Sequence, residues 1–158
     1  MNWQEVCEHP SLKDLPFKIE TDETGKIIMS PVKFYHSLFQ GEIAFLLNSL
    51  LPKGRAVPEC AIKTRKGTKV VDVAWLSFER LAQVRHQIDI EIAPEICIEV
   101  LSESNTKKEM IEKSALYFEL GAKEVWLCSK NGDMRFLNEK HELIHSELAP
   151  KFPLKIEA

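Results

Sequence analysis

The fold is indicated most clearly by residues 94–102, which read Pro-Glu-Ile-Cys-Ile-Glu-Val-Leu-Ser. Isoleucine and valine alternate with other residues through Glu95 to Leu101, which is the pattern of a strand with a buried face. Glu99 lies on the opposite face, which it shares with Cys97 and Leu101. We therefore expect a core strand that presents one acid among apolar neighbours.

A helix is predicted to follow this strand. Thr106 and Glu109 have the spacing of a capping box, and Gly121 is typical of the position just past a helix end. Glu124 to Ser129 is a second core strand, and a turn at residues 130–133 leads into a further strand over Met134 to Asn138.

Upstream, Lys18 to Glu20 and Lys26 to Ser30 flank a turn that contains Gly25, which predicts a small hairpin. Pro31 to Leu51 has Phe, Leu and Ile at helical spacing and predicts a long helix. Ala56 to Arg65 and Lys69 to Leu76 are expected to form an antiparallel pair.

These elements predict an α/β protein with a mixed sheet flanked by helices. Ser77 to Ala93 is polar and irregular and contains one candidate helical turn, and Phe152 to Ile156 reads as a short strand-like piece. We see no internal repeat or second domain, so we expect a single domain over residues 1–158.

Composition limits the classes of function. A hydrophobic content of 44% suits a globular core, and a formal charge of −3 gives no overall field that would attract nucleic acid. The four cysteines have no Cys-x-x-Cys pair, which argues against zinc and disulfide frameworks. Because no signal peptide or membrane span is visible, we expect a cytoplasmic protein without a membrane partner.

Each helix has one charged residue among its apolar positions. On a helical wheel, Glu42 falls within the apolar arc expected for the first helix, and Lys113 within that of the second. Buried charges are costly unless they are paired or bound to metal. Rotation of the first helix and snorkelling of the lysine are the alternative explanations.

The strands repeat this pattern, because Asp72 shares a face with Val70 and Ala74, as Glu99 does with Cys97. Each acid alone could be an edge residue or an ion-pair partner. Together, Glu42, Asp72 and Glu99 form a set of hard oxygen ligands that suits Mg²⁺ or Mn²⁺, with Lys113 beside them. Such a set indicates hydrolysis of phosphodiester bonds.

Residues 94–102 resemble the Uma-two family of predicted endonucleases, together with Ser104-Asn105, Lys113, Tyr117, Gly121 and residues 124–127. Ser30-Pro31 with His36, and residues 71–74, are similar to earlier signatures of that family. The resemblance implies a restriction-endonuclease-like fold of the PD-(D/E)xK superfamily, with Asp72 and Glu99 as its two acids.

Two positions depart from the superfamily motif. Val71 replaces its proline, and Leu101 stands where its lysine is expected. The resemblance implies that Lys113, on the following helix, takes over that lysine's role. It also implies that Glu42 corresponds, less closely than the other acids, to one that the first helix supplies.

The resulting hypothesis is a Mg²⁺-dependent DNA endonuclease with Asp72, Glu99 and Lys113 as catalytic residues and Glu42, Asp72 and Glu99 as metal ligands. Basic residues near the site are candidates for phosphate contacts, although such residues also serve simply to keep a hairpin soluble: Lys63, Arg65, Lys66 and Lys107. Cleavage of both strands of a duplex would favour a homodimer.

Two alternatives remain open. The first is an inactive module on the same fold that binds nucleic acid or protein. The second is a purely structural ion-pair network, for which Lys113→Met would leave stability unchanged or raise it.

Overall fold

The computed structural model describes residues 1–157, and its main body is a six-stranded sheet in the order β3-β4-β5-β6-β7-β8. β5 and β6 are parallel, and the other neighbouring strands are antiparallel, so the sheet is mixed as the sequence predicts. The strands are β3 Gly54–Thr64, β4 Gly67–Ser77, β5 Ile96–Val100, β6 Glu124–Cys128, β7 Met134–Leu137 and β8 Glu142–Leu143.

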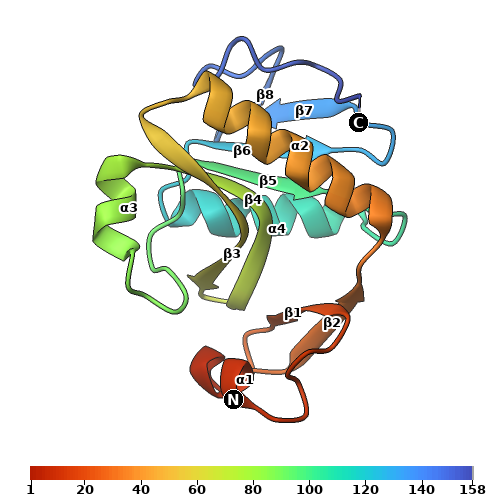
Figure 1. The fold of residues 1–158 in the computed structure, drawn as a ribbon, viewed down its shortest axis with the longest axis vertical. Helices are drawn as coiled ribbons and strands as arrows, with labels where there is room; N and C mark the ends of the chain where they lie inside the picture. Colours follow the sequence, from red (N-terminus) through yellow and green to blue (C-terminus); the bar gives the residue numbers. More distant parts are fainter. Residues whose placement is uncertain (158) are drawn as a thin grey trace.

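Helices cover both faces of this sheet (Figure 1). α2 (Phe34–Leu50) buries Phe39, Ile43 and Leu47 against one face. α3 (Phe78–Val84) and α4 (Lys107–Glu119) cover the other face, where Tyr117 is fully buried. In the described part of the chain, no helix has the length and apolarity needed to cross a membrane.

A separate two-stranded sheet, β1 (Phe17–Thr21) with β2 (Ile27–Pro31), lies beside the main sheet together with α1 (Trp3–Glu8) (Figure 1). Its side chains bind the start of β4, because Glu20 accepts a hydrogen bond from the Val70 N–H at 2.7 Å and the Thr21 hydroxyl accepts one from Thr68 N–H at 2.8 Å. These contacts hold β1 alongside β4.

Gly67 makes this close approach possible. Its φ of +91° is in the left-handed region, and a Cβ there would collide with the backbone carbonyl oxygens of Thr21 and Asp22. Any other residue at position 67 would therefore push the hairpin away from β4.

The predicted strand over Phe152 to Ile156 is wrong. The segment is irregular apart from a single bridge between Lys155 and Asp133, although Phe152 and Ile156 are buried in the core on the α2 side. Pro153 lacks the N–H that a regular ladder needs, so the segment instead packs against the β6–β7 turn, where Ile156 N–H donates to the Gly132 carbonyl.

Candidate active site

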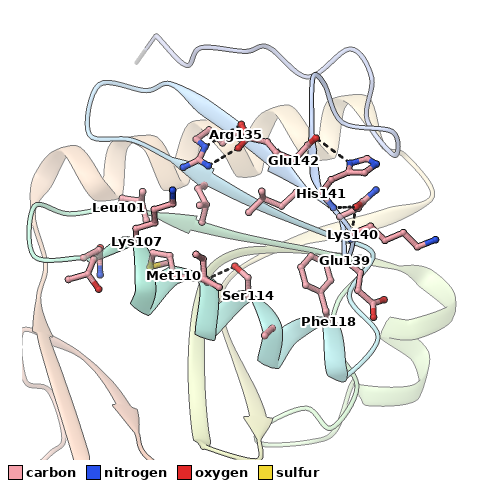
Figure 2. A pocket seen from close by; sticks show the side chains of 17 residues that line it. Leu101, Lys107, Met110, Ser114, Phe118, Arg135, Glu139, Lys140, His141 and Glu142 are labelled. Carbon is pink, nitrogen blue, oxygen red and sulfur yellow. Dashed lines mark hydrogen bonds and ion pairs between the residues drawn. The ribbon is translucent and has the colours of Figure 1, made fainter.

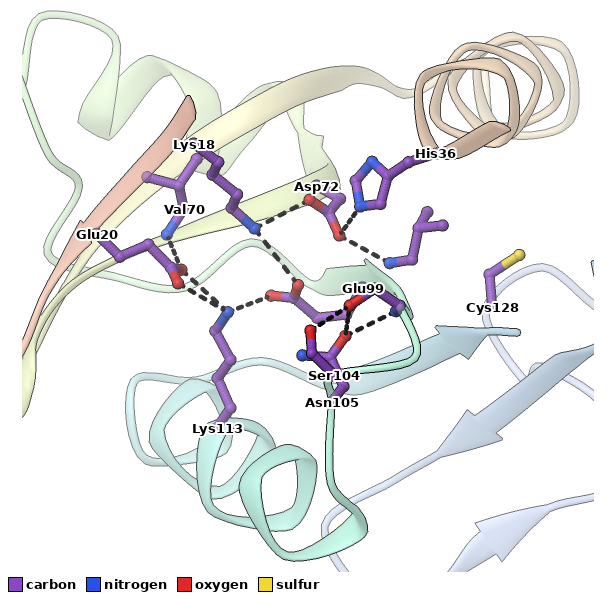
Figure 3. Close-up of polar contacts among 12 residues, drawn as sticks. Lys18, Glu20, His36, Val70, Asp72, Glu99, Ser104, Asn105, Lys113 and Cys128 are labelled. Carbon is purple, nitrogen blue, oxygen red and sulfur yellow. Dashed lines mark hydrogen bonds and ion pairs between the residues drawn. The ribbon is translucent and has the colours of Figure 1, made fainter. Parts of the chain in front are cut away.

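The acids of β4 and β5 converge on a single cation. Asp72 and Glu99 are 2% and 3% exposed. The ammonium nitrogen of Lys18, from β1, lies 2.9 Å from Asp72 Oδ1 and 3.7 Å from Glu99 Oε2 (Figure 3). Two carboxylates that are 27 positions apart in the chain thus share one ammonium group at the edge of the hairpin.

A second ammonium group and an imidazole complete the site. Lys113 Nζ, from α4, lies 3.0 Å from Glu20 Oε2 and 3.5 Å from Glu99 Oε1, and His36 Nε2, from α2, lies 3.3 Å from Asp72 Oδ2. We call this set the acid–lysine cluster. It borders a cavity of about 90 Å³ and consists of Lys18, Glu20, His36, Asp72, Glu99 and Lys113.

Glu99 is the carboxyl whose ionisation is most disfavoured. Burial raises the pKa of Glu99 from 4.5 to about 7, although the ammonium groups of Lys113 and Lys18 oppose the rise. The nearby carboxylates of Asp72 and Glu20 add to it. At neutral pH the metal-free protein therefore holds a proton at Glu99 in a substantial fraction of molecules.

Asp72 behaves in the opposite way. Burial would raise its pKa, but hydrogen bonds from His36 and Lys18 and their charges hold the pKa of Asp72 well below its usual value. Asp72 Oδ2 also accepts the Val100 N–H at 2.8 Å. The hydrogen bond to Asp72 raises the pKa of His36 in return. Asp72 is thus ionised throughout the neutral range.

Tyr117 orients Glu99, because its buried hydroxyl donates to Glu99 Oε1 at 2.8 Å. Tyr117→Phe is expected to lower the free energy of unfolding by about 2 kcal/mol at pH 8, where Glu99 is ionised and loses a donor. Denaturant unfolding monitored by circular dichroism measures the effect.

Tyr35→Phe is the matched control. Tyr35 Oη is buried without a hydrogen-bond partner among the described residues. Removing it should leave stability unchanged or raise it. Equal losses in both variants would contradict the role given to the Tyr117 hydroxyl.

Two other buried acids have structural partners. Glu124 accepts hydrogen bonds from Trp126, Ser146 and two backbone N–H groups, and Glu95 accepts one from Ser77 N–H and contacts Arg80. Their oxygen atoms are already bonded to parts of the fold. Neither of them lines the cavity beside which Asp72 and Glu99 meet the ammonium groups.

Glu42 lies outside the cluster, contrary to the expectation from the helical wheel. It is half-buried on the flank of α2, does not line the cavity, and has no ion pair within residues 1–157. The apolar arc predicted for this helix included Phe34 and Phe45, but these side chains are 82% and 64% exposed. The predicted arc was therefore centred on the wrong side of the helix. His36 is the α2 side chain that reaches the site.

The basic residues proposed for phosphate contacts do not line the cluster's cavity. Lys63 and Arg65 form exposed ion pairs with Glu91 and Glu119, and Lys66 is half-buried. Lys107 is exposed on the border of a larger groove of about 660 Å³ between α4 and β7–β8, shown in Figure 2.

The chain also matches a known protein family. The family model described as "Uma2: Putative restriction endonuclease" matches residues 3–149. The chain belongs to the Uma2 family. This confirms the resemblance found in the sequence, and the acid–lysine cluster lies entirely within the matched residues.

One solved structure similar to this Uma2 chain is described as a crystal structure of a putative nuclease belonging to DUF820 from Anabaena variabilis. The TM-score is 0.69, with 21% identity over 89% of this chain and 90% of that one. At this identity the likeness supports the fold alone. The search of curated proteins gave no match.

Sequence reasoning missed Lys18 and Glu20 of this Uma2 protein. Both lie on β1 and alternate with Phe17 and Ile19, so they point to the same side of the hairpin. That alternation was the one sequence signal that could have pointed to these two residues. It indicates a polar face, but not that the face meets Asp72.

Proposed function

We propose that this protein is a Mg²⁺- or Mn²⁺-dependent endonuclease that hydrolyses DNA phosphodiester bonds at the acid–lysine cluster. The observation that carries the proposal is the convergence of Asp72 and Glu99 on one ammonium group, that of Lys18. Two hard carboxylates that share one cation are a suitable donor set for a divalent ion. The family description, "Putative restriction endonuclease", supports the choice of substrate.

Asp72 and Glu99 would hold the ion, and Lys18 marks the cation position between them. Among the described residues, no group of three or more His, Cys, Asp or Glu side chains is arranged to hold a metal. Mg²⁺ commonly uses only one or two carboxylates, with water and substrate phosphate as further ligands. When bound, the ion would supply Lewis-acid activation of the phosphodiester and of water.

The chain's own residues would prepare the site for a phosphate. The ammonium group of Lys113 would balance negative charge that develops on the phosphate oxygens. His36 and the Val100 N–H hold Asp72, and Tyr117 holds Glu99. Both acids are therefore oriented by neighbours that a bound ion would not have to displace.

Lys113→Met is expected to reduce metal-dependent DNA cleavage by about 10²-fold or more, because one electrostatic partner of the reacting phosphate is lost. Initial rates on duplex and single-stranded DNA with Mg²⁺ or Mn²⁺ measure this loss. Lys108→Met, at an exposed position of α4, is the control and should cleave at the rate of the unmodified protein. Equal rates in both variants would remove Lys113 from the mechanism.

Phosphate contacts are proposed for Lys63, Arg65, Lys66 and Lys107. The exposed pairs Lys63–Glu91 and Arg65–Glu119 are solvent-screened, so each contributes little and a DNA phosphate could replace the carboxylate. Neutralising these residues should weaken DNA binding and reduce its salt dependence.

A second candidate is a catalytically inactive binding module on the same fold. The observation that favours it is that Lys18 and Lys113 already neutralise much of the charge of Glu20, Asp72 and Glu99. Titration calorimetry with Mg²⁺ and Mn²⁺ separates the two functions. A heat of metal binding that is present in the unmodified protein and absent in Asp72→Asn supports the nuclease. If the unmodified protein shows neither a heat of metal binding nor DNA cleavage, the result supports the inactive binding module.

A further inference from the structure

α2 has apolar residues on two opposite faces. Phe39, Ile43 and Leu47 are buried against the sheet, with exposed fractions of 8%, 0% and 0%. At 100° per residue, Phe34 and Phe45 project to the other side, where they are 82% and 64% exposed. The same outer face includes Leu38, which is 41% exposed, and Gly41.

The charge of α2 is also unusual for a helix on a protein surface. Its 17 residues include a single carboxylate, Glu42, and neither lysine nor arginine. A surface helix ordinarily has a charged outer face. α4 follows this rule with five charged residues at exposed positions: Lys107, Lys108, Glu109, Glu112 and Glu119. The outer face of α2 is thus uncharged and rich in large apolar side chains, with Ser37 and Ser49 as exposed polar residues at its margins.

Gly41 lies at the middle of this outer face, between Leu38 and Phe45. A Cβ at position 41 would meet nothing within 4 Å, so the protomer itself has no steric need for glycine there. Glycine in a helix interior lowers helix stability relative to alanine. Close approach of another helix backbone gives this glycine a purpose.

We propose that the outer face of α2 is the interface of a symmetric homodimer, in which α2 packs against α2 of the partner across Gly41. This proposal goes beyond the nuclease function and does not depend on it. In an antiparallel pair centred on Gly41, Leu38 of one protomer faces the region of Phe45 in its partner. The contact is therefore self-complementary.

The charge and area of the face fit a second copy of the chain. A face without charges can meet its own copy without like-charge repulsion. Val32, Phe34, Leu38 and Phe45 together expose apolar area on the order of 500 Å², if a phenylalanine side chain is taken as about 200 Å². A standard interface buries about 800 Å² per partner, of which somewhat more than half is apolar.

The test is the oligomeric state of the full chain, measured by sedimentation velocity between about 1 and 100 μM. We expect a dimer for the unmodified protein. Phe45→Glu should raise the dissociation constant on the order of 100-fold or more, because the substitution enters the interface twice. Gly41→Leu should also give monomers, since its side chain blocks the approach of the second helix.

Two controls show whether a substitution acts on the α2 interface itself. One checks that the variant still folds, and the other places a charge on a different helix. Position 41 has open space within the protomer, so Gly41→Leu should keep the circular dichroism spectrum of the unmodified chain. Ile111→Glu replaces an apolar residue of α4 that is 60% exposed and should leave the dimer intact. A monomer in the unmodified protein up to 100 μM, or a dimer that survives both α2 substitutions, would overturn the proposal.

Discussion

Asp72→Asn is expected to abolish DNA cleavage, with a loss of about 10³-fold or more, while the protein stays folded. Asparagine keeps a carbonyl oxygen that can accept the Val100 N–H, but it removes the negative charge that Lys18 and His36 contact. A divalent ion would lose one of two charged ligands. Cleavage of duplex and single-stranded DNA with Mn²⁺ or Mg²⁺, together with metal titration calorimetry, measures both effects.

Glu103→Gln is the matched control, because Glu103 is an exposed carboxylate whose partner is Lys130. It removes one negative charge outside the cluster and should leave cleavage and metal binding unchanged. Full cleavage by Asp72→Asn, or equal losses in the two variants, would contradict the proposed site.

Glu99→Gln is expected to make the metal-free protein more stable at pH 8, by about 3 kcal/mol at most. Burial raises the pKa of Glu99 to about 7 from 4.5, so ionised Glu99 is unfavourable in the folded state. The amide resembles the protonated carboxyl and can accept the Tyr117 hydroxyl. The same substitution should abolish metal-dependent cleavage.

The sign of the pH effect follows from proton binding. Between pH 4.5 and 7 the folded protein retains the Glu99 proton that the unfolded chain releases, so this group's contribution to stability is complete below pH 4.5 and is lost as pH rises through 7. The difference in free energy of unfolding between Glu99→Gln and the unmodified protein should thus grow from pH 5 to pH 8. Denaturant unfolding in the presence of a chelator measures it, and a difference that shrinks with pH would refute it.

The sheet and its two strand acids could be predicted because strand alternation is a local property. Residues 94–102 show the period of two directly, and the same period places Asp72 among Val70 and Ala74. The capping box at Thr106 and Glu109 marked the start of α4, and both of its hydrogen bonds are present. Lys113 then follows from the helical period.

The remaining members of the cluster could not be predicted in this way. Lys18 is 54 positions from Asp72, and Glu20 is 93 positions from Lys113, so their contacts depend on how the hairpin docks. Glu42 misled the prediction because α2 is apolar on two faces, and hydrophobicity alone does not say which face meets the sheet.

The β1–β2 hairpin supplies Lys18 and Glu20 but shares no backbone ladder with the main sheet. Its attachment to β4 consists largely of side-chain hydrogen bonds and ion pairs, together with the close fit at Gly67. Local opening of such a unit costs less free energy than global unfolding. Opening of the hairpin would take Lys18 and Glu20 away from Asp72, Glu99 and Lys113 while the main sheet stays paired, and added salt or a change of pH would favour this opening by weakening the ion pairs.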